Sequence, residues 1–108
     1  MDPRSIPEQN RDLLLFRQWV KTEAQRIADE EGKGSLELHR EMVKFWEEHR
    51  PQMCRRLGPD LTGSLAVVLA RKMEEAETAN LEAGMYRTDA REQAERDWLL
   101  MEPETQET

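Results

Sequence analysis

The chain has 108 residues, of which 37% are hydrophobic and 36% charged, and a formal net charge of −7. This length allows one hydrophobic core but not two, so we expect a single domain. The longest uninterrupted apolar run, Leu65 to Ala70, is far shorter than the roughly 20 residues that cross a bilayer, which excludes a membrane span. The net negative charge disfavours nucleic acid as a partner, because phosphate groups repel such a chain unless it has a local basic face.

Two features of the chain bear on its compartment. Cys54 is the single cysteine, so no internal disulfide can form, which fits a reducing environment. The chain opens on Met1 and Asp2 without the charged lead and apolar stretch of a secretory signal. We therefore expect a cytoplasmic protein.

Residue types that favour helices are abundant, so we predict an all-α fold whose first helix spans residues 5–31. Ser5 and Glu8 have the spacing of a capping box at its start. Gly32 and Gly34 readily adopt the left-handed backbone that ends helices. The apolar stripe expected in the core contains Leu13, Phe16, Val20, Ala24, Ile27 and Ala28.

The second helix is predicted to start at its cap, Ser35, and to end near Pro51. A short helix over residues 51–57 follows, and Gly58 and Pro59 end it. The sequence leaves open whether these two helices form one kinked rod. The core stripe of the second helix contains Leu38, Met42, Phe45 and His49, with Trp46 at its edge.

The third helix has Asp60 as its predicted cap and ends near Gly84. Its segment from Leu65 to Ala70 is apolar on every side, which indicates that other helices surround it and that it forms the centre of the fold. The following residues, 71–83, keep only an alanine-lined face, which consists of Ala76, Ala79 and Ala83.

The fourth helix is predicted to start at Thr88 or Asp89 and to end at Pro103. Residues 1–101 then form a single helical domain, and residues 102–108 a flexible acidic tail. Short connections predict a compact bundle of four main helices plus a short connecting helix, with mostly antiparallel neighbours. The apolar face of the fourth helix contains Ala90, Ala94, Trp98 and Met101.

No group of residues predicts catalysis, a cofactor, a metal site or a small-molecule substrate. His39 and His49 lack the spacing that places two ligands on one helix face. The arginines that follow Cys54 favour a reactive thiolate if the sulfur is exposed, but a small buried side chain is the stronger interpretation. A small enzyme with an unrecognised site remains an alternative.

A nucleic-acid regulator is a second alternative. Residues 53–73 have the length of a helix-turn-helix, and Arg50, Arg55 and Arg56 are its candidate phosphate contacts. The would-be recognition helix, however, presents the apolar segment Leu65 to Ala70 where polar and basic side chains are needed.

An acidic mimic that occupies a basic nucleic-acid-binding groove is a variant of this alternative. Interspersed arginines and lysines at helical spacing favour ordinary ion pairing instead. The carboxylates concerned are Glu74, Glu75, Glu77, Glu82, Asp89, Glu92, Glu95 and Asp97.

Apolar side chains outside the core stripes are the positive functional signal. Leu15 and Trp19 lie one turn apart and more than about 100° from the main stripe of the first helix, and Val67 and Leu99 are similarly placed on theirs. A compact bundle that surrounds the first helix would cover them all, and this alternative stays open. Our hypothesis is a non-enzymatic interaction or regulatory module that binds a protein partner, or a second copy of itself, through these four residues.

Overall fold

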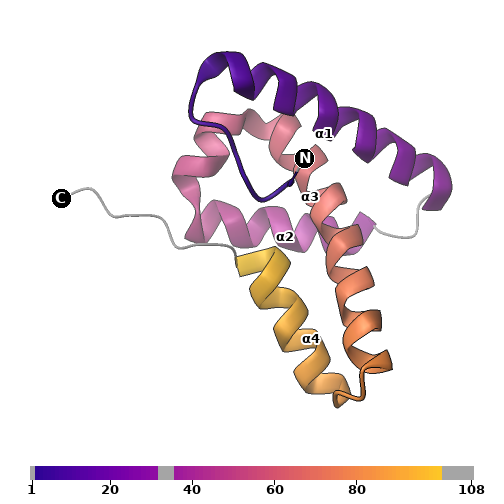
Figure 1. Cartoon of the computed structure of the whole chain (residues 1–108). Coiled ribbons are helices and arrows are strands. Elements are labelled where there is room, and N and C mark those ends of the chain that lie inside the picture. Colours follow the sequence, from indigo (N-terminus) through magenta and orange to yellow (C-terminus); the bar gives the residue numbers. More distant parts are fainter. Residues whose placement is uncertain (1, 32–35, 101–108) are drawn as a thin grey trace.

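The structure, a computed structural model, describes residues 2–31 and 36–100, and these ranges contain helices and no strand. Figure 1 shows their arrangement as a compact bundle, so the predicted all-α fold is confirmed. Of the helices in these ranges, none combines the length and apolar character that crossing a lipid bilayer requires. The elements, in chain order, are α1 (Asn10–Glu31), α2 (Leu36–His49), α3 (Pro51–Glu82), α4 (Arg87–Glu95) and the π-helical turn η1 (Arg96–Leu100).

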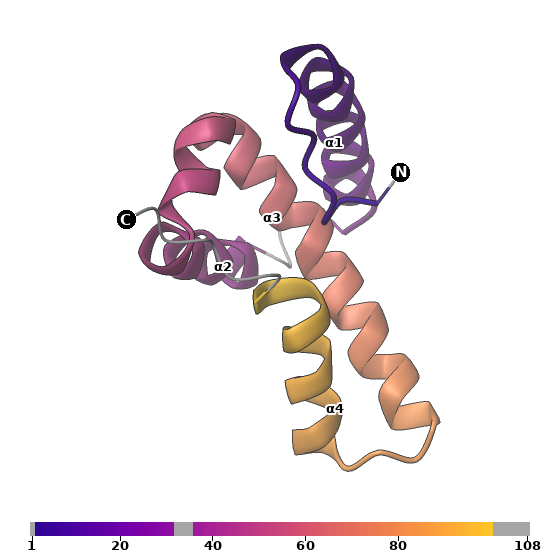
Figure 2. The same ribbon diagram turned by 60° about the vertical axis from the view of Figure 1, so that its left-hand side comes forward.

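Helix α3 is the centre of the fold. The other helices and η1 all pack against it, and α1 and α2 lie on opposite sides of it in Figure 2. From Leu65 to Ala70 every side chain is buried except Val67, which is half-buried against the same core. The prediction that this all-apolar segment is surrounded by other helices is therefore confirmed.

A kink at Gly58 divides α3 into two arms. Gly58 has φ 80° and ψ 162°, a conformation that is essentially restricted to glycine, and Pro59 cannot donate the next helical hydrogen bond. The Thr62 hydroxyl donates to the Gly58 carbonyl at 2.7 Å and satisfies it. The predicted short helix over 51–57 is thus the first arm of α3, bent where its end was predicted.

This region resolves one alternative that the sequence left open and corrects one prediction. The short helix does not form one rod with α2, because the non-helical backbone of Arg50, with φ −135° and ψ 55°, separates them. Asp60 lies inside α3 instead of capping it. Its carboxylate instead accepts hydrogen bonds from Lys21 and Arg17 of α1.

The start of α1 at Asn10, not Ser5, is another correction. Residues before it form a turn in which the Ser5 amide donates to the Asp2 carbonyl at 3.1 Å. Arg4 then reaches η1, where its Nη1 donates to the Asp97 carbonyl at 3.1 Å and its guanidinium lies 4.1 Å above the Trp98 ring. These tertiary contacts keep the segment out of the helix, so its capping-box pattern is not used.

The core stripe of α1 was predicted well, with one exception. Phe16, Val20, Ala24 and Ile27 are buried, whereas Ala28 is exposed because its direction is about 90° from the middle of the stripe.

On α2, Trp46 is fully buried and His49 is exposed, the reverse of their predicted ranking. The Trp46 indole is buried with its polar atom satisfied, since Nε1 donates to the Leu99 carbonyl at 2.9 Å. His49 is at the last turn of α2, where its ring packs at 4.4 Å on Phe45 instead of entering the core.

Helix α4 returns alongside the second arm of α3 as a hairpin in both views (Figures 1 and 2). Ala90 and Ala94 are buried and allow the two helices to approach closely. α4 begins at Arg87 after Tyr86, without a side-chain cap, so the predicted start at Thr88 or Asp89 is wrong.

The alanine face predicted for the second arm of α3 is also wrong in part. Ala79 and Ala83 are exposed, because they lie at the far end of the hairpin, and among residues 71–83 Met73 is the fully buried one. Mostly antiparallel packing remains a prediction for the other helix pairs. The glycine and serine signals at 32–35, the end at Pro103 and the tail 102–108 fall outside the described residues.

Candidate functional site

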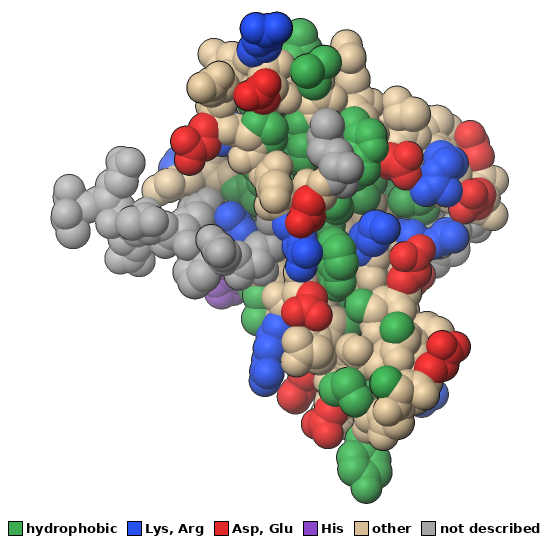
Figure 3. Space-filling model, viewed as in Figure 1, with side chains coloured by type: hydrophobic (Ala, Val, Ile, Leu, Met, Phe, Trp, Pro, Cys, Tyr) green, Lys and Arg blue, Asp and Glu red, His purple; other side chains and the backbone are tan. Residues whose placement is uncertain are grey.

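The outer face of α1 carries two adjacent exposed leucines. Leu14 is 59% exposed and Leu15 is 56% exposed, whereas Phe16 and Val20 on the opposite face are fully buried. Figure 3 shows hydrophobic surface near the N-terminal end of α1. Leu15 was predicted as a partner contact and Leu14 was not, although its helical direction also points away from the core stripe. We call this pair the leucine patch.

Trp19 is less accessible to a partner than its place in the sequence suggested. It is half-buried, packs on the core and lies 6.4 Å from Phe16, measured between ring centroids. It lines a cleft of about 330 Å³ together with Pro3, Val68 and Trp98. The N-terminal segment therefore covers part of the α1 surface around Trp19, which the core face of α1 does not include.

Val67 and Leu99 are also half-buried against the core. The Leu99 carbonyl accepts the Trp46 hydrogen bond, so this residue is fixed to the interior of the bundle. Of the four predicted contact residues, only Leu15 is fully on the surface.

Of the three arginines proposed for nucleic acid, Arg50 and Arg56 line one cleft, which Arg55 does not line. Arg55 is exposed, Arg56 donates through Nη2 to the Pro7 carbonyl, and Arg50 is half-buried beside the start of α3. Because the apolar segment of the second arm is buried in the core, it does not present side chains to a groove of DNA.

The residues weighed for enzyme chemistry lie apart. His49 is exposed and its Nε2 is 3.9 Å from a Glu48 carboxylate oxygen, whereas Cys54 is half-buried against the core. Neither lines the two clefts found beside the N-terminal segment. Within the ranges that the structure covers, no three histidine, cysteine or acidic side chains are grouped to hold a metal ion.

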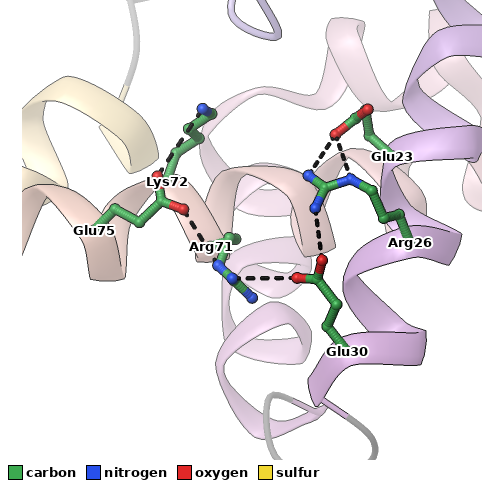
Figure 4. Close-up of polar contacts among 6 residues, drawn as sticks. All are labelled: Glu23, Arg26, Glu30, Arg71, Lys72 and Glu75. Atoms are coloured by element: carbon green, nitrogen blue, oxygen red, sulfur yellow. Dashed lines mark hydrogen bonds and ion pairs between the residues drawn. The ribbon is translucent and has the colours of Figure 1, made fainter.

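A chain of ion pairs links α1 to α3 (Figure 4). Arg26 lies between Glu23 at 2.7 Å and Glu30 at 3.0 Å, and Arg71 of α3 reaches Glu30 at 3.3 Å and Glu75 at 3.2 Å. The hydrogen bond that Arg26 donates to the Glu23 carboxylate is the main cause that raises the pKa of Arg26. Solvent screens such surface pairs, so the network orients the helices more than it stabilises them.

Ion pairing also occupies acidic side chains of the α3–α4 hairpin. Arg91 of α4 pairs with Glu77 of α3 and with Glu95, each at 3.0 Å. Burial lowers the pKa of Arg91, but its hydrogen bonds to these two carboxylates outweigh burial and the net shift is upward. The Arg91–Glu95 pair has the predicted helical spacing, whereas the Arg91–Glu77 pair joins two helices. Both pairs occupy carboxylates that a nucleic-acid mimic would present freely.

The tip of the hairpin exposes a tyrosine that the sequence did not single out. Tyr86 is 83% exposed and Leu81 nearby is 38% exposed. Hydrophobic surface protrudes at this tip in Figure 3. The one signal for Tyr86 in the sequence is its place two residues after Gly84, whose φ of 96° makes the turn.

Comparison with known proteins supplies no relative for these surfaces. No protein-family model, no curated protein and no solved structure matches the chain.

Proposed function

We propose that this chain is a non-enzymatic, cytoplasmic helical module that binds a protein partner through the leucine patch of α1. The exposure of Leu14 and Leu15, side by side on a helix whose other face is buried, is the observation that carries the proposal. Adjacent exposed leucines on a rigid helix suit insertion into an apolar groove of a partner.

The size of the patch favours a different protein over a second copy. Covering the exposed half of a leucine contributes about 1 kcal/mol, so the four leucines of two facing patches give about 4 kcal/mol. Association costs at least about 4 kcal/mol in lost freedom of motion, so two small patches facing each other do not hold a dimer. A partner must contribute further contact surface of its own.

A positive charge next to the leucine patch suggests that the rim of the partner's groove is acidic. Arg11 lies one turn before the leucines, is exposed and forms no ion pair within the described residues. A groove with an acidic rim would meet this guanidinium and gain orientation from it.

The test places a photo-crosslinking amino acid at position 15 of the full chain in its native cells. A second protein should be captured there in a defined ratio, and Leu14→Lys should remove it. A crosslinker at the exposed Leu81 is the matched control, since it should not capture the same protein. Equal capture at both positions, or capture insensitive to Leu14→Lys, contradicts the proposal.

Sedimentation of the purified chain separates the two kinds of partner. We expect a monomer at micromolar concentration. A dimer that Leu15→Lys dissociates would show that the patch binds a second copy instead of another protein.

A further inference from the structure

A cleft of about 790 Å³ lies where the N-terminal segment, the start of α3 and η1 meet. Among the residues that line it are four arginines, Arg4, Arg50, Arg56 and Arg96, and three carboxylates. A local excess of guanidinium groups is unexpected in a chain whose net charge is −7. The cleft is separate from the leucine patch, because neither leucine lines it.

Arg50 is the unusual member of this group. Its Nε and Nη1 atoms are buried and have no hydrogen-bond partner within the described part of the chain. Arg50 is also one of the residues that line the cleft. Burying guanidinium nitrogens without partners is costly, and an anion beside the same group would offset part of that cost.

The other arginines divide into two kinds. Arg4 is paired with Asp2 at 3.3 Å and is bound to η1, and Arg56 is tied to the Pro7 carbonyl, so both fix the N-terminal wall of the cleft. Arg96 forms no ion pair among the described residues. The N-terminal wall is therefore held in place, and the positive charges of Arg50 and Arg96 are left to bind a ligand.

The carboxylates of the cleft are partly committed to other contacts. Asp2 is neutralised by Arg4, whose backbone amide is the main cause that lowers the pKa of Asp2. Asp97 accepts a hydrogen bond from the Gln93 side chain at 3.2 Å. Glu8 is left as the acidic group without an ion pair in the described ranges.

We propose that this cleft binds the phosphate group of a small molecule through Arg50 and Arg96, between walls that Arg4 and Arg56 fix. The planar guanidinium matches the spacing of phosphate oxygens and is the preferred group for such recognition. The volume is within the range of about 300–1,000 Å³ typical of small-molecule sites and exceeds what a single phosphate needs.

Calorimetric titration of the full chain at low ionic strength tests the site with three probes: inorganic phosphate, diphosphate and glycerol phosphate. We expect saturable binding with a stoichiometry of one for at least one of them. Tighter binding of glycerol phosphate than of both inorganic probes identifies an organic phosphate, and the reverse order identifies an inorganic one. Citrate is titrated as a carboxylate control. Tighter binding of citrate than of all three phosphate probes overturns the assignment to phosphate.

Substitutions supply the matched comparison. Arg50→Met and Arg96→Gln should each weaken binding roughly tenfold or more, as expected for loss of a charge-assisted hydrogen bond. Arg55→Gln removes the same charge from an exposed residue that does not line the cleft, so it should leave the Kd unchanged. Equal weakening by all three substitutions, or no saturable binding to any probe, overturns the proposal.

Stability distinguishes a binding role of Arg50 from a structural one. Arg50→Met removes buried nitrogens that have no partner, so its unfolding temperature should equal or exceed that of the unsubstituted chain. A large fall in that temperature would show that Arg50 supports the fold instead. Arg96→Gln, at an exposed position, then decides the binding result alone.

Discussion

Replacing Gly58 with alanine should destabilise the protein through the backbone alone. Its φ of 80° and ψ of 162° lie in a region that other residues enter at a cost of about 1–3 kcal/mol. A Cβ added there has no atom within 4 Å, so no steric clash contributes. Alanine also lowers the conformational entropy of the unfolded chain, which stabilises the folded state by about 0.4–1 kcal/mol. The net loss should be about 1–2 kcal/mol, or roughly 4 °C in Tm for each kcal/mol.

Gly63 provides the matched control in the same helix. A Cβ there also has no atom within 4 Å, but the backbone of Gly63 has no positive φ. Gly63→Ala should therefore stabilise the protein by about 0.5–1 kcal/mol, because alanine loses less backbone entropy. Urea unfolding followed by far-UV circular dichroism measures both variants. If both variants changed the free energy of unfolding in the same direction, or if Gly58→Ala left it unchanged, the backbone strain at Gly58 would be refuted.

Three further substitutions test other contacts. Trp46→Phe leaves the Leu99 carbonyl without its donor, and urea unfolding should show a loss of about 1–3 kcal/mol. Lys21 lowers the pKa of Asp60 from 3.8, so the carboxylate stabilises the fold above that pH and loses this effect as pH falls through its folded pKa. Asp60→Asn should flatten this acid loss in a pH series of Tm, and an unchanged slope would contradict the pair. Arg71→Gln should cost at most about 1 kcal/mol, an effect that high salt reproduces in the unsubstituted chain.

The centre of the fold was predictable because the pattern there is unambiguous. A run from Leu65 to Ala70 without a polar side chain has no stable position except inside a helix bundle, and burial follows from composition. The stripe on α1 is similarly clear, since Phe16, Val20 and Ile27 repeat at helical spacing.

The errors occur where a distant contact outweighs a local preference. Ser5 and Glu8 have good capping spacing, but Arg4 gains contacts with η1 almost the whole chain away, and those keep the segment out of the helix. Trp46 was placed at the edge of a stripe because periodicity does not show the Leu99 carbonyl that accepts its N–H. Local pattern carries no information about either partner.

The candidate sites were less predictable than the fold for the same reason. Leu15 is exposed and Trp19 is covered because the N-terminal segment crosses one side of α1 and not the other. The arginine cleft joins residues from both ends of the chain and from its middle, such as Arg4, Arg50 and Arg96. No spacing rule along the sequence connects them.

Net charge and local charge together favour a small anion over a nucleic acid as the ligand of this cleft. At physiological ionic strength charges act over about 8 Å, so a compact phosphate within the cleft is influenced mainly by the arginines that line it. A duplex extends far beyond the cleft and meets a protein surface with an overall charge of −7. Diphosphate binding should therefore persist at salt concentrations that abolish any association with duplex DNA. If DNA instead bound more tightly than diphosphate and Arg55→Gln weakened it, the exposed arginines would form the functional surface and the cleft would not.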